Sequence, residues 1–379
     1  LMDRASLGSV EEKAGMPAMI RGVSPTTTAL LVETQAADFT TLSSQVQAIA
    51  DALEKRVTLR TTDGGQTHEW RLEGADLAFP AIFTDHAGQS DNLWKVRKGL
   101  LPSVGAVRDL GTTVLIEDVA FPIHSLAPAT LDLQTLFDKH GYRDAIIFGH
   151  ALAGNLHFVF SPNFGRSAEL DRYARFMDDI AHMVVDVYDG SLKAEHGTGR
   201  NMAPFVEKEW GGNAYGLMQE IKAIFDPKGL LNPGVILNTN PTVHLEHLKP
   251  LPPADPLIDA CMECGFCECH CPSRNLSLTP RQRIVIQREI ARLTASGEDA
   301  YRLAELKRGY GWQGEATCAA DGLCGVACPV EVDTGKFTKT FRSRMVKGQP
   351  YQWLADRAAD HFGPLTAGIR ACLLYTSDA

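Results

Sequence analysis

The sequence predicts an α+β domain, a sheet with helices on one face, followed by a mainly helical, cysteine-rich part. Three observations predict this order. Strand and helix patterns follow one another without a long repeat over residues 1–240, which is typical of α+β domains. Five prolines lie within residues 241–256 and disfavour both helix and central strand, so we expect a semi-rigid linker there. Eight of the nine cysteines fall into two groups, at residues 261–271 and 318–328.

The expected elements follow from the spacing of apolar residues, because apolar runs predict buried strands and helical spacing predicts helices. Asp38 is a candidate N-cap of the first helix, and the Asp226–Pro227 turn ends the last helix of the α+β part. The second helix is expected to turn four side chains inward: Leu131, Leu133, Leu136 and Phe137. In chain order we expect a buried strand at 28–33, a helix at 38–56, a strand at 112–121, a helix at 127–140, two strands around a glycine turn in 144–160, helices at 168–189 and 213–225, one or two helices in 281–308, and a basic helix at 336–347.

The composition narrows the class of protein. The chain has 379 residues, of which 44% are hydrophobic and 22% charged, so it can bury a sizeable core and is neither disordered nor fibrous. Its formal charge of -9 argues against nucleic acid as the main partner. No apolar run approaches the ~18 residues of a membrane span, and the first residues lack a signal-peptide core. Because clustered cysteines indicate a reducing compartment, we expect a cytoplasmic protein.

The strongest motif is a cysteine run that reads CMECGFCECHCP. Its spacing, C-x2-C-x2-C-x3-C-P, is the bacterial ligand run for a [4Fe–4S] cluster, and thiolates are soft ligands suited to iron. A zinc knuckle is the alternative, although zinc sites usually combine two separated CxxC elements. We expect Cys269 to be a bystander. The spaced cysteines are Cys261, Cys264, Cys267 and Cys271.

A second run, CAADGLCGVACP, follows the same template, but Asp321 stands where the second cysteine would be. In two-cluster ferredoxins the cysteine before proline ligates the other cluster. Asp321, water or nothing would then bind the fourth iron of the second cluster. A carboxylate binds this iron more weakly than a thiolate, which predicts a labile iron and conversion to [3Fe–4S]; alternatively, Asp321 only shapes the turn. We expect a first [4Fe–4S] cluster on Cys261, Cys264, Cys267 and Cys328, and a second on Cys271, Cys318 and Cys324.

Three motifs lie upstream of the cysteines: GHALAGNLH, EHGTGR and DPKGLLNPGVIL. His150 and His157 are seven residues apart across a glycine turn. Together with the carboxylate of Glu195 they predict a divalent-metal site for zinc or manganese. The adjacent His196 is left free as an acid–base group near neutral pH.

These motifs, in this order, resemble those of flavin-dependent 2-hydroxy-acid dehydrogenases of the vanillyl-alcohol-oxidase fold. That group includes D-lactate dehydrogenase, D-2-hydroxyglutarate dehydrogenase and the flavin subunit of glycolate oxidase. The double cysteine run resembles the large form fused to an iron–sulfur module, as in respiratory D-lactate dehydrogenases of bacteria. The resemblance covers residues 1 to about 350. It implies an antiparallel sheet with flanking helices, which is the C-terminal substrate half of such a flavoenzyme, followed by an α-helical ferredoxin-like domain.

The resemblance also implies roles for single residues. His150, His157 and Glu195 would bind the divalent metal, which polarises the substrate's hydroxyl and carboxylate as a Lewis acid. His196 would take the hydroxyl proton while hydride passes to the flavin. Arg97, in the segment LWKVRKG, matches the arginine that holds the substrate carboxylate.

Asn232, in the LNPG segment, would lie near the flavin or the substrate; alternatively it is a turn residue before Pro233. The resemblance further implies that this chain is a central fragment, because an N-terminal domain that cradles FAD and a C-terminal cysteine-rich domain are absent. We therefore expect weak or no FAD binding and no activity from the fragment alone. The expected domains are an FAD-linked oxidase C-terminal (substrate) domain at 1–240, the linker at 241–256, a double iron–sulfur domain at 257–350 and the start of a truncated region at 351–379.

The leading prediction is oxidation of a small D-2-hydroxy acid, first of all D-lactate to pyruvate. Electrons would pass from FAD through both clusters to a quinone or a cytochrome. D-2-hydroxyglutarate and glycolate are alternative substrates, with Lys98 and Arg108 as candidate cations for a second carboxylate. A non-catalytic electron-transfer subunit and a zinc-binding structural protein are alternative classes. A quinone acceptor would require peripheral contact with the inner face of the cell membrane, and the basic segment 336–347 is either a solvated helix face or such a docking surface.

Overall fold

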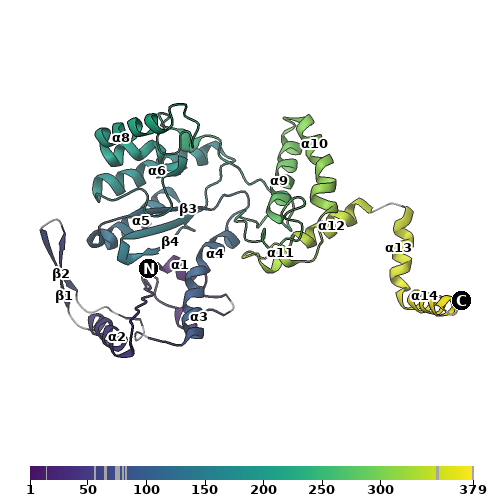
Figure 1. Cartoon of the computed structure of the whole chain (residues 1–379), viewed down its shortest axis with the longest axis horizontal. Coiled ribbons are helices and arrows are strands. Elements are labelled where there is room, and N and C mark those ends of the chain that lie inside the picture. Colours follow the sequence, from purple (N-terminus) through teal and green to yellow (C-terminus); the bar gives the residue numbers. More distant parts are fainter. Residues whose placement is uncertain are drawn as a thin grey trace. The chain divides into compact units, whose positions relative to one another are not determined.

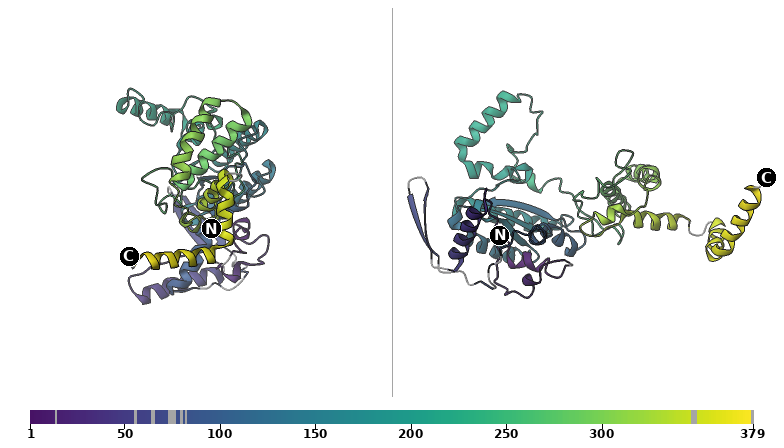
Figure 2. Two further views of the ribbon diagram at one scale, coloured as in Figure 1. Left: turned by 90° about the vertical axis from the view of Figure 1, so that its right-hand side faces the viewer. Right: turned by 60° about the horizontal axis from the view of Figure 1, so that its bottom comes forward.

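The structure is a computed structural model that describes residues 1–13, 15–54, 57–63, 66–72, 77–78, 81, 83–346 and 350–377. The chain divides into two compact units, Leu1–Leu251 and Pro252–Ala379 (Figures 1 and 2). The division falls inside the proline-rich segment 241–256. Each unit has its own hydrophobic core, and the two are described separately below.

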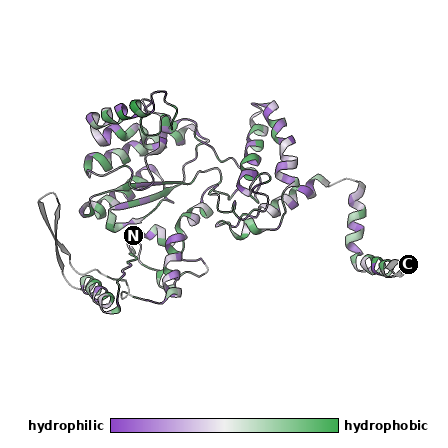
Figure 3. Cartoon of the chain, in the orientation of Figure 1, coloured by the Kyte–Doolittle hydropathy of each residue, from purple (hydrophilic) through white to green (hydrophobic). Residues whose placement is uncertain are grey.

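A three-stranded antiparallel sheet forms the centre of the first unit. It consists of β3 (Leu115–Ala120), β4 (Ile146–His150) and β5 (Asn155–Phe160), in the order β3-β5-β4. Every residue of the central strand β5 is buried, and Figure 3 shows the sheet as largely hydrophobic. The strands predicted within 112–121 and 144–160 are thus confirmed.

Two long helices cover one face of this sheet: α5 (Leu126–His140) and α6 (Ser167–Ala181), the latter followed by a π-helical turn at His182–Val187. Leu133 and Phe137 of α5 are buried as predicted. Leu131, however, is 63% exposed, so its predicted inward orientation is wrong. Leu133 and Phe137 are four residues apart and share one side of the helix, whereas Leu131 precedes Leu133 by only two residues and therefore points elsewhere.

The opposite face of the sheet is also covered, so the prediction of helices on one face only is wrong. Three helices, α1 (Arg4–Gly8), α3 (Ala87–Lys98) and α4 (Leu100–Val107), lie on that side (Figure 1). Alternate strand residues point to opposite faces. Phe148 and Val159 therefore pack into a second core together with Val10, which follows α1, and with four residues of these helices: Leu7, Val96, Leu100 and Val104.

The predicted buried strand at 28–33 is also wrong. Only Ala29 pairs, through a single bridge to Met2, and Leu30 and Val32 are 59% and 53% exposed. An apolar run forms a strand only where a neighbour offers a hydrogen-bonding edge, and Met2 offers one position.

The helix predicted at 38–56 is observed as α2 (Phe39–Glu54), and residues 55–56 lie outside the described part of the chain. As predicted, Asp38 caps it by accepting a hydrogen bond from the N–H of Thr41. The sequence analysis missed the antiparallel hairpin of β1 (Val57–Asp63) and β2 (Gln66–Leu72).

The remaining helices of the first unit follow the sheet. α7 (Gly199–Met202) is short, and α8 (Val206–Phe225) begins earlier than the predicted 213–225. Its backbone breaks at Gly211, where φ is 76°, so a first turn precedes the predicted helix. Short 3-10 helices lie at Ala18–Ile20, Ile123–Ser125, Ala151–Ala153, Ala203–Phe205 and Val243–Leu245.

The second unit is helical around the cysteines. The prediction of one or two helices in 281–308 is confirmed as two, α9 and α10, and Thr279 opens α9 with a reciprocal capping box to Gln282. A small core around Ile258, Ile284 and Phe337 holds the unit together. The elements are α9 (Pro280–Ser296), α10 (Ala300–Tyr310), a π-helical turn at Gly311–Ala316, α11 (Leu323–Val326), α12 (Thr334–Val346), α13 (Pro350–Asp360) and α14 (Phe362–Ser377).

The predicted basic helix is α12, and Lys347 lies outside the described residues. Two of its basic side chains make contacts within the unit: Arg342 pairs with Glu315 and Arg344 with Asp255, each at 2.6 Å. Among the described residues, no helix is both long enough and apolar enough to span a bilayer.

Candidate functional site

The two histidines of the glycine turn lie on neighbouring strands of the sheet. His150 ends β4 and His157 lies within β5, where it pairs with Phe148. The turn between them depends on close backbone contacts. A Cβ on Gly149 would lie 2.1 Å from the carbonyl oxygen of Asn155, and one on Gly154 would lie 2.0 Å from that of Phe121. Glycine is therefore required at both positions, and the turn fixes the spacing of the two rings.

Glu195 joins the two histidines, as the sequence predicted. Its Oε1 lies 2.9 Å from Nε2 of His157 and 3.5 Å from Nε2 of His150. One donor atom from each residue lies within 4.8 Å of the other two. Three N and O ligands with an open side are the donor set of a catalytic zinc site, and His150 and Glu195 are both more than half exposed. The residues therefore fit a divalent metal that a substrate can also reach.

His157 has the protonation state that metal binding requires. Burial, followed by the neighbouring His196, lowers the pKa of His157 to about 4. Its ring is therefore neutral at physiological pH and has a lone pair to offer. Nδ1 of His157 is buried without a hydrogen-bond partner in the described residues, so Nε2, which faces Glu195, is the nitrogen placed for a metal.

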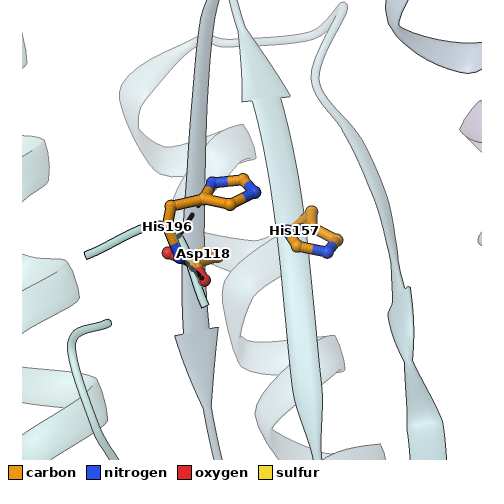
Figure 4. Close-up of side chains that lie close together, drawn as sticks. All are labelled: Asp118, His157 and His196. Atoms are coloured by element: carbon orange, nitrogen blue, oxygen red, sulfur yellow. Dashed lines mark hydrogen bonds and ion pairs between the residues drawn. The ribbon is translucent and has the colours of Figure 1, made fainter. Parts of the chain in front are cut away.

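His196 lies directly beside these ligands. Its ring stacks on that of His157, with centroids 4.8 Å apart and an interplanar angle of 18°. Figure 4 shows His157 on its strand and His196 reaching toward it from a loop. Nδ1 of His196 lies 3.8 Å from Oδ1 of Asp118, and Nε2 lies 4.0 Å from Oε1 of Glu195. His196 therefore lies beside the histidines and the carboxylate with which the sequence grouped it, and its role as a base remains a prediction.

Asp118 is the residue that sequence reasoning missed. It is fully buried on β3, directly opposite His157 in the sheet. Its Oδ2 accepts hydrogen bonds from the backbone N–H groups of Ala194, Glu195 and His196 at 3.2, 2.6 and 3.1 Å. Burial alone would raise the pKa of Asp118, but the N–H groups of Glu195 and His196, together with the nearby Lys193 and His196 side chains, hold that pKa below its usual value. The sequence signal that could have revealed Asp118 is a charged residue inside the apolar strand segment VLIEDVAF.

Asp118, His157 and His196 also form a second group whose donors lie within 4.8 Å of one another. Oδ2 of Asp118 is already occupied by three N–H donors, whereas the carboxylate of Glu195 is exposed and faces two histidine nitrogens. The geometry therefore favours Glu195 as the metal ligand and Asp118 as the anchor of the loop that carries it.

Asp118→Asn is expected to weaken metal binding by about 10–100-fold, the range typical of residues that orient metal ligands. The amide keeps the size of the side chain but loses the charge that holds three N–H groups. Titration with a competing chelator measures the change. Asp186→Asn, at an exposed carboxylate paired with Lys208, is the control that should leave metal affinity unchanged. Unchanged affinity in Asp118→Asn would show that the loop does not depend on this anchor.

Arg97 reaches the same region from α3. Its guanidinium carbon lies 4.2 Å from the ring centroid of Phe148, the residue paired with His157 across the sheet. Burial lowers the pKa of Arg97, and the nearby carboxylate of Glu195 opposes that shift. Within the described residues Arg97 forms no ion pair closer than 4 Å, so its donors are available to a ligand.

Asn232 lies apart from these groups. It is exposed, has a φ of 40°, and makes no hydrogen bond to the histidines or Glu195 in the described part of the chain. Its loop is held by Asp226, which accepts hydrogen bonds from the N–H groups of Leu230 and Leu231 and from Lys222. The structure thus gives Asn232 a turn conformation, and its contact with a flavin or substrate remains a prediction.

Among the described residues, the cysteines of both runs form no disulfide. Burial raises the pKa of Cys267 to about 12, and Cys261, Cys328 and Cys324 add to the effect. Cys261, Cys267 and Cys328 belong to the ligand set predicted for the first cluster, whose remaining member, Cys264, is exposed, whereas Cys324 belongs to the set predicted for the second. Cys269 is exposed and contacts the carbonyl of Phe266, as expected of a bystander.

In the second run, Cys324 is buried against the start of α12, where the N–H groups of Thr334 and Gly335 face its sulfur. Oδ1 of Asp333 lies 3.8 Å from Sγ of Cys324, a carboxylate that the sequence analysis missed. Asp321 is exposed and accepts a hydrogen bond from the N–H of Leu323 at 3.1 Å, which is the turn-shaping alternative.

Among the described residues, no three cysteine sulfurs lie within 4.8 Å of one another. The choice between an iron–sulfur module and a zinc knuckle stays a prediction.

Comparison with known proteins agrees with the first unit. The sequence profile of the family "FAD linked oxidases, C-terminal domain" matches residues 1–236. The chain is 25% identical to glycolate oxidase subunit GlcD of Bacillus subtilis over 154 residues, which cover 41% of this chain and 32% of that protein. It is 30% identical to the mitochondrial D-lactate dehydrogenase [cytochrome] of Arabidopsis thaliana over 159 residues, covering 41% and 27%.

A third relative is D-2-hydroxyglutarate dehydrogenase of Haemophilus influenzae, 25% identical over 303 residues that cover 66% of this chain and 29% of that protein. In each of these matches the chain spans no more than about a third of the relative's length.

Proposed function

The chain belongs to the family of FAD-linked oxidases through the C-terminal domain that its residues 1–236 form, and on that basis we propose that it is the substrate-oxidising part of an FAD-dependent D-2-hydroxy-acid dehydrogenase. The observation that carries the proposal is the meeting of His150, His157 and Glu195 next to His196. D-lactate, oxidised to pyruvate, is the proposed substrate, with D-2-hydroxyglutarate and glycolate as the alternatives.

Each residue of the site has a separate proposed role. His150, His157 and Glu195 would hold zinc or manganese, which when bound supplies Lewis-acid polarisation of the substrate's oxygens. FAD, when bound, would supply the hydride-accepting chemistry that this oxidation needs. Nδ1 of His196 faces Asp118, which leaves Nε2 to accept the hydroxyl proton.

The exposure of the site supports a cofactor that covers it. His150 and Glu195 are 54% and 53% exposed in their side chains, and Leu152 in the same turn is 91% exposed. An open metal site loses bound water only when another part of the protein or a cofactor closes over it. A flat, largely apolar ring system bound over this face would exclude that water from the reaction.

Arg97→Lys is expected to raise KM for D-lactate by about 10–100-fold with a smaller change in kcat. A planar guanidinium holds a carboxylate with two hydrogen bonds, and lysine offers only a point charge; a lost charged hydrogen bond of about 1.5–3 kcal/mol corresponds to this range. Steady-state kinetics of the FAD-loaded holoenzyme measure it. Lys95→Ala, at an exposed residue of the same helix, is the control, and an unchanged KM in Arg97→Lys would remove the assignment.

Two residues are candidates to bind a second substrate carboxylate, and Lys98 is the exposed one. The other candidate, Arg108, is buried and donates to the backbone carbonyls of Gly105 and Thr112, which makes it a part of the fold. A preference for D-2-hydroxyglutarate that disappears in Lys98→Ala would therefore favour the dicarboxylic substrate.

We also propose that electrons leave the flavin through two iron–sulfur clusters in the second unit, toward a quinone or a cytochrome. Support comes from the two cysteine runs, from the effect of Cys261, Cys328 and Cys324 on the pKa of Cys267, and from backbone N–H groups that face Cys324. N–H groups of this kind stabilise the charge of ligating thiolates. A quinone acceptor would imply peripheral contact with the inner face of the cell membrane.

The deciding experiment is dye reduction by the FAD-loaded holoenzyme with D-lactate, L-lactate, D-2-hydroxyglutarate and glycolate, with and without a chelator. Oxidation of one D-acid that is lost on chelation and restored by zinc or manganese supports the proposal. Iron and acid-labile sulfide are measured on the same sample. No turnover, in a protein that holds FAD and iron, would favour a pure electron-transfer role instead.

A further inference from the structure

A fully buried arginine lies between the two cysteine runs. Arg283, on α9, is 1% exposed and is the largest of the fully buried side chains. Its Nε donates to the carbonyl of Gly314 at 2.7 Å, Nη2 to the hydroxyl of Thr317 at 3.4 Å, and Nη1 faces Sγ of Cys271 at 3.6 Å. In the described part of the chain no Asp or Glu side chain pairs with Arg283. A buried cation without an anion is costly, so this charge requires a negative partner.

A second buried arginine on the same helix shows the contrast. Arg288 is 3% exposed, and its Nη1 lies 2.7 Å from Oε1 of Glu263. Its remaining bonds go to the carbonyls of Asp259 and Cys261. The positive charge next to Cys261 is therefore balanced by a carboxylate, whereas the one next to Cys271 is not.

Arg283 also connects the segments that carry the second ligand set. Thr317, which it contacts, precedes Cys318, and the Thr317 hydroxyl is 2.5 Å from that of Ser277. Ser273, two residues after Cys271, donates to the carbonyl of Thr317. The guanidinium is thus fixed where the Cys271 and Cys318 segments meet, and the sulfur of Cys271 is the one group in contact with it that becomes anionic when it binds a metal.

We propose that Arg283 is the charge-balancing residue of the cluster held by Cys271, Cys318 and Cys324, and that it raises the reduction potential of that cluster above that of the other. The inference rests on the iron–sulfur part of the proposed function. Reduction adds one electron, which the flavin supplies after substrate oxidation, and no proton. A fixed positive charge favours the more negative, reduced form. Electrons would then run from the Cys261 cluster to the Cys271 cluster and leave from there.

An EPR-monitored redox titration of the holoenzyme tests this. Arg283→Gln keeps an N–H donor and removes the charge. The variant is expected to lower the midpoint potential of one cluster by about 59 mV or more, which is a tenfold change in the reduction equilibrium of a one-electron couple. The midpoint potential of the other cluster should stay unchanged. Arg292→Gln on the same helix removes a half-buried charge that is paired with Glu289 and Glu298, and should move neither potential.

If Arg283→Gln contains both clusters and their potentials are unchanged, the inference is overturned while the proposed function stays intact. Absence of iron and sulfide from the wild-type protein would overturn the iron–sulfur proposal itself, and the inference with it. If the glutamine variant loses one cluster, Arg283→Lys decides by iron and sulfide content. If Arg283→Lys retains both clusters, the positive charge of the side chain is what the cluster needs. If Arg283→Lys also loses a cluster, Arg283 has a packing role and the proposal is refuted.

Discussion

Replacing His196 by alanine is expected to lower kcat of the FAD-loaded holoenzyme by about 10²–10⁴-fold, the contribution of a positioned general base. The ring is held in place by stacking on His157 and by the backbone bonds from Asp118 to its loop. Its Nε2 is the nitrogen turned away from Asp118 and toward the ligand carboxylate of Glu195. Without the ring, the substrate hydroxyl has only water to receive its proton, so chemistry slows while substrate binding, which depends on the metal and Arg97, changes little.

Two measurements separate this effect from a damaged site. Metal and FAD content of His196→Ala should equal those of the wild type, because neither His150, His157 nor Glu195 is altered. His182→Ala, at a surface histidine paired with Asp186, is the matched control and should retain wild-type kcat. A metal- and flavin-loaded His196→Ala enzyme with undiminished kcat would rule out this histidine as the base.

Glu195→Gln is expected to weaken metal binding by more than about 100-fold, beyond the range for residues that only orient a ligand. The amide removes the anionic member of the ligand set and leaves two neutral imidazoles. Because the Glu195 side chain is 53% exposed, the substitution should leave the fold intact. Activity should be lost in the purified variant and recover in part with excess zinc or manganese.

Metal analysis by mass spectrometry, together with the thermal melting curve, checks this expectation. Glu220→Gln, at an exposed carboxylate of α8, is the control and should keep its metal. A Glu195→Gln protein that retains a full equivalent of metal would mean that another donor, such as Asp118, completes the site.

The meeting of His150 and His157 was predictable because it follows local rules. A strand, a turn with two obligatory glycines and a second strand place the two histidines on neighbouring strands, and each of these signals can be read within a few residues of the chain. The sheet strands, α2, α6 and the two helices after the first cysteine run were predictable for the same reason. The apolar spacing of each decides its structure without reference to distant partners.

The features that escaped prediction depend on distant partners. Asp118 is anchored to N–H groups 76 to 78 residues away, so no pattern around it reveals its role. The core on the second face of the sheet is assembled from α1, α3 and α4, whose individual patterns are weak. The segment 28–33 reads as a strand but finds only Met2 to pair with. Arg283 is similar, because its burial follows from the meeting of two separate cysteine segments.

The three proposed metal ligands are not equally open to redesign. His150 and His157 are fixed by the register of β4 and β5 and by a turn that tolerates no side chain at Gly149 or Gly154. Glu195 is carried by a loop. For protein engineering, two of the three ligand positions are therefore fixed by the fold, and the third can be exchanged. A library at Glu195 that offers cysteine or aspartate would explore softer or shorter ligands, and so other metals, while the sheet stays intact. A library in the turn would destroy the centre before any new preference could be selected.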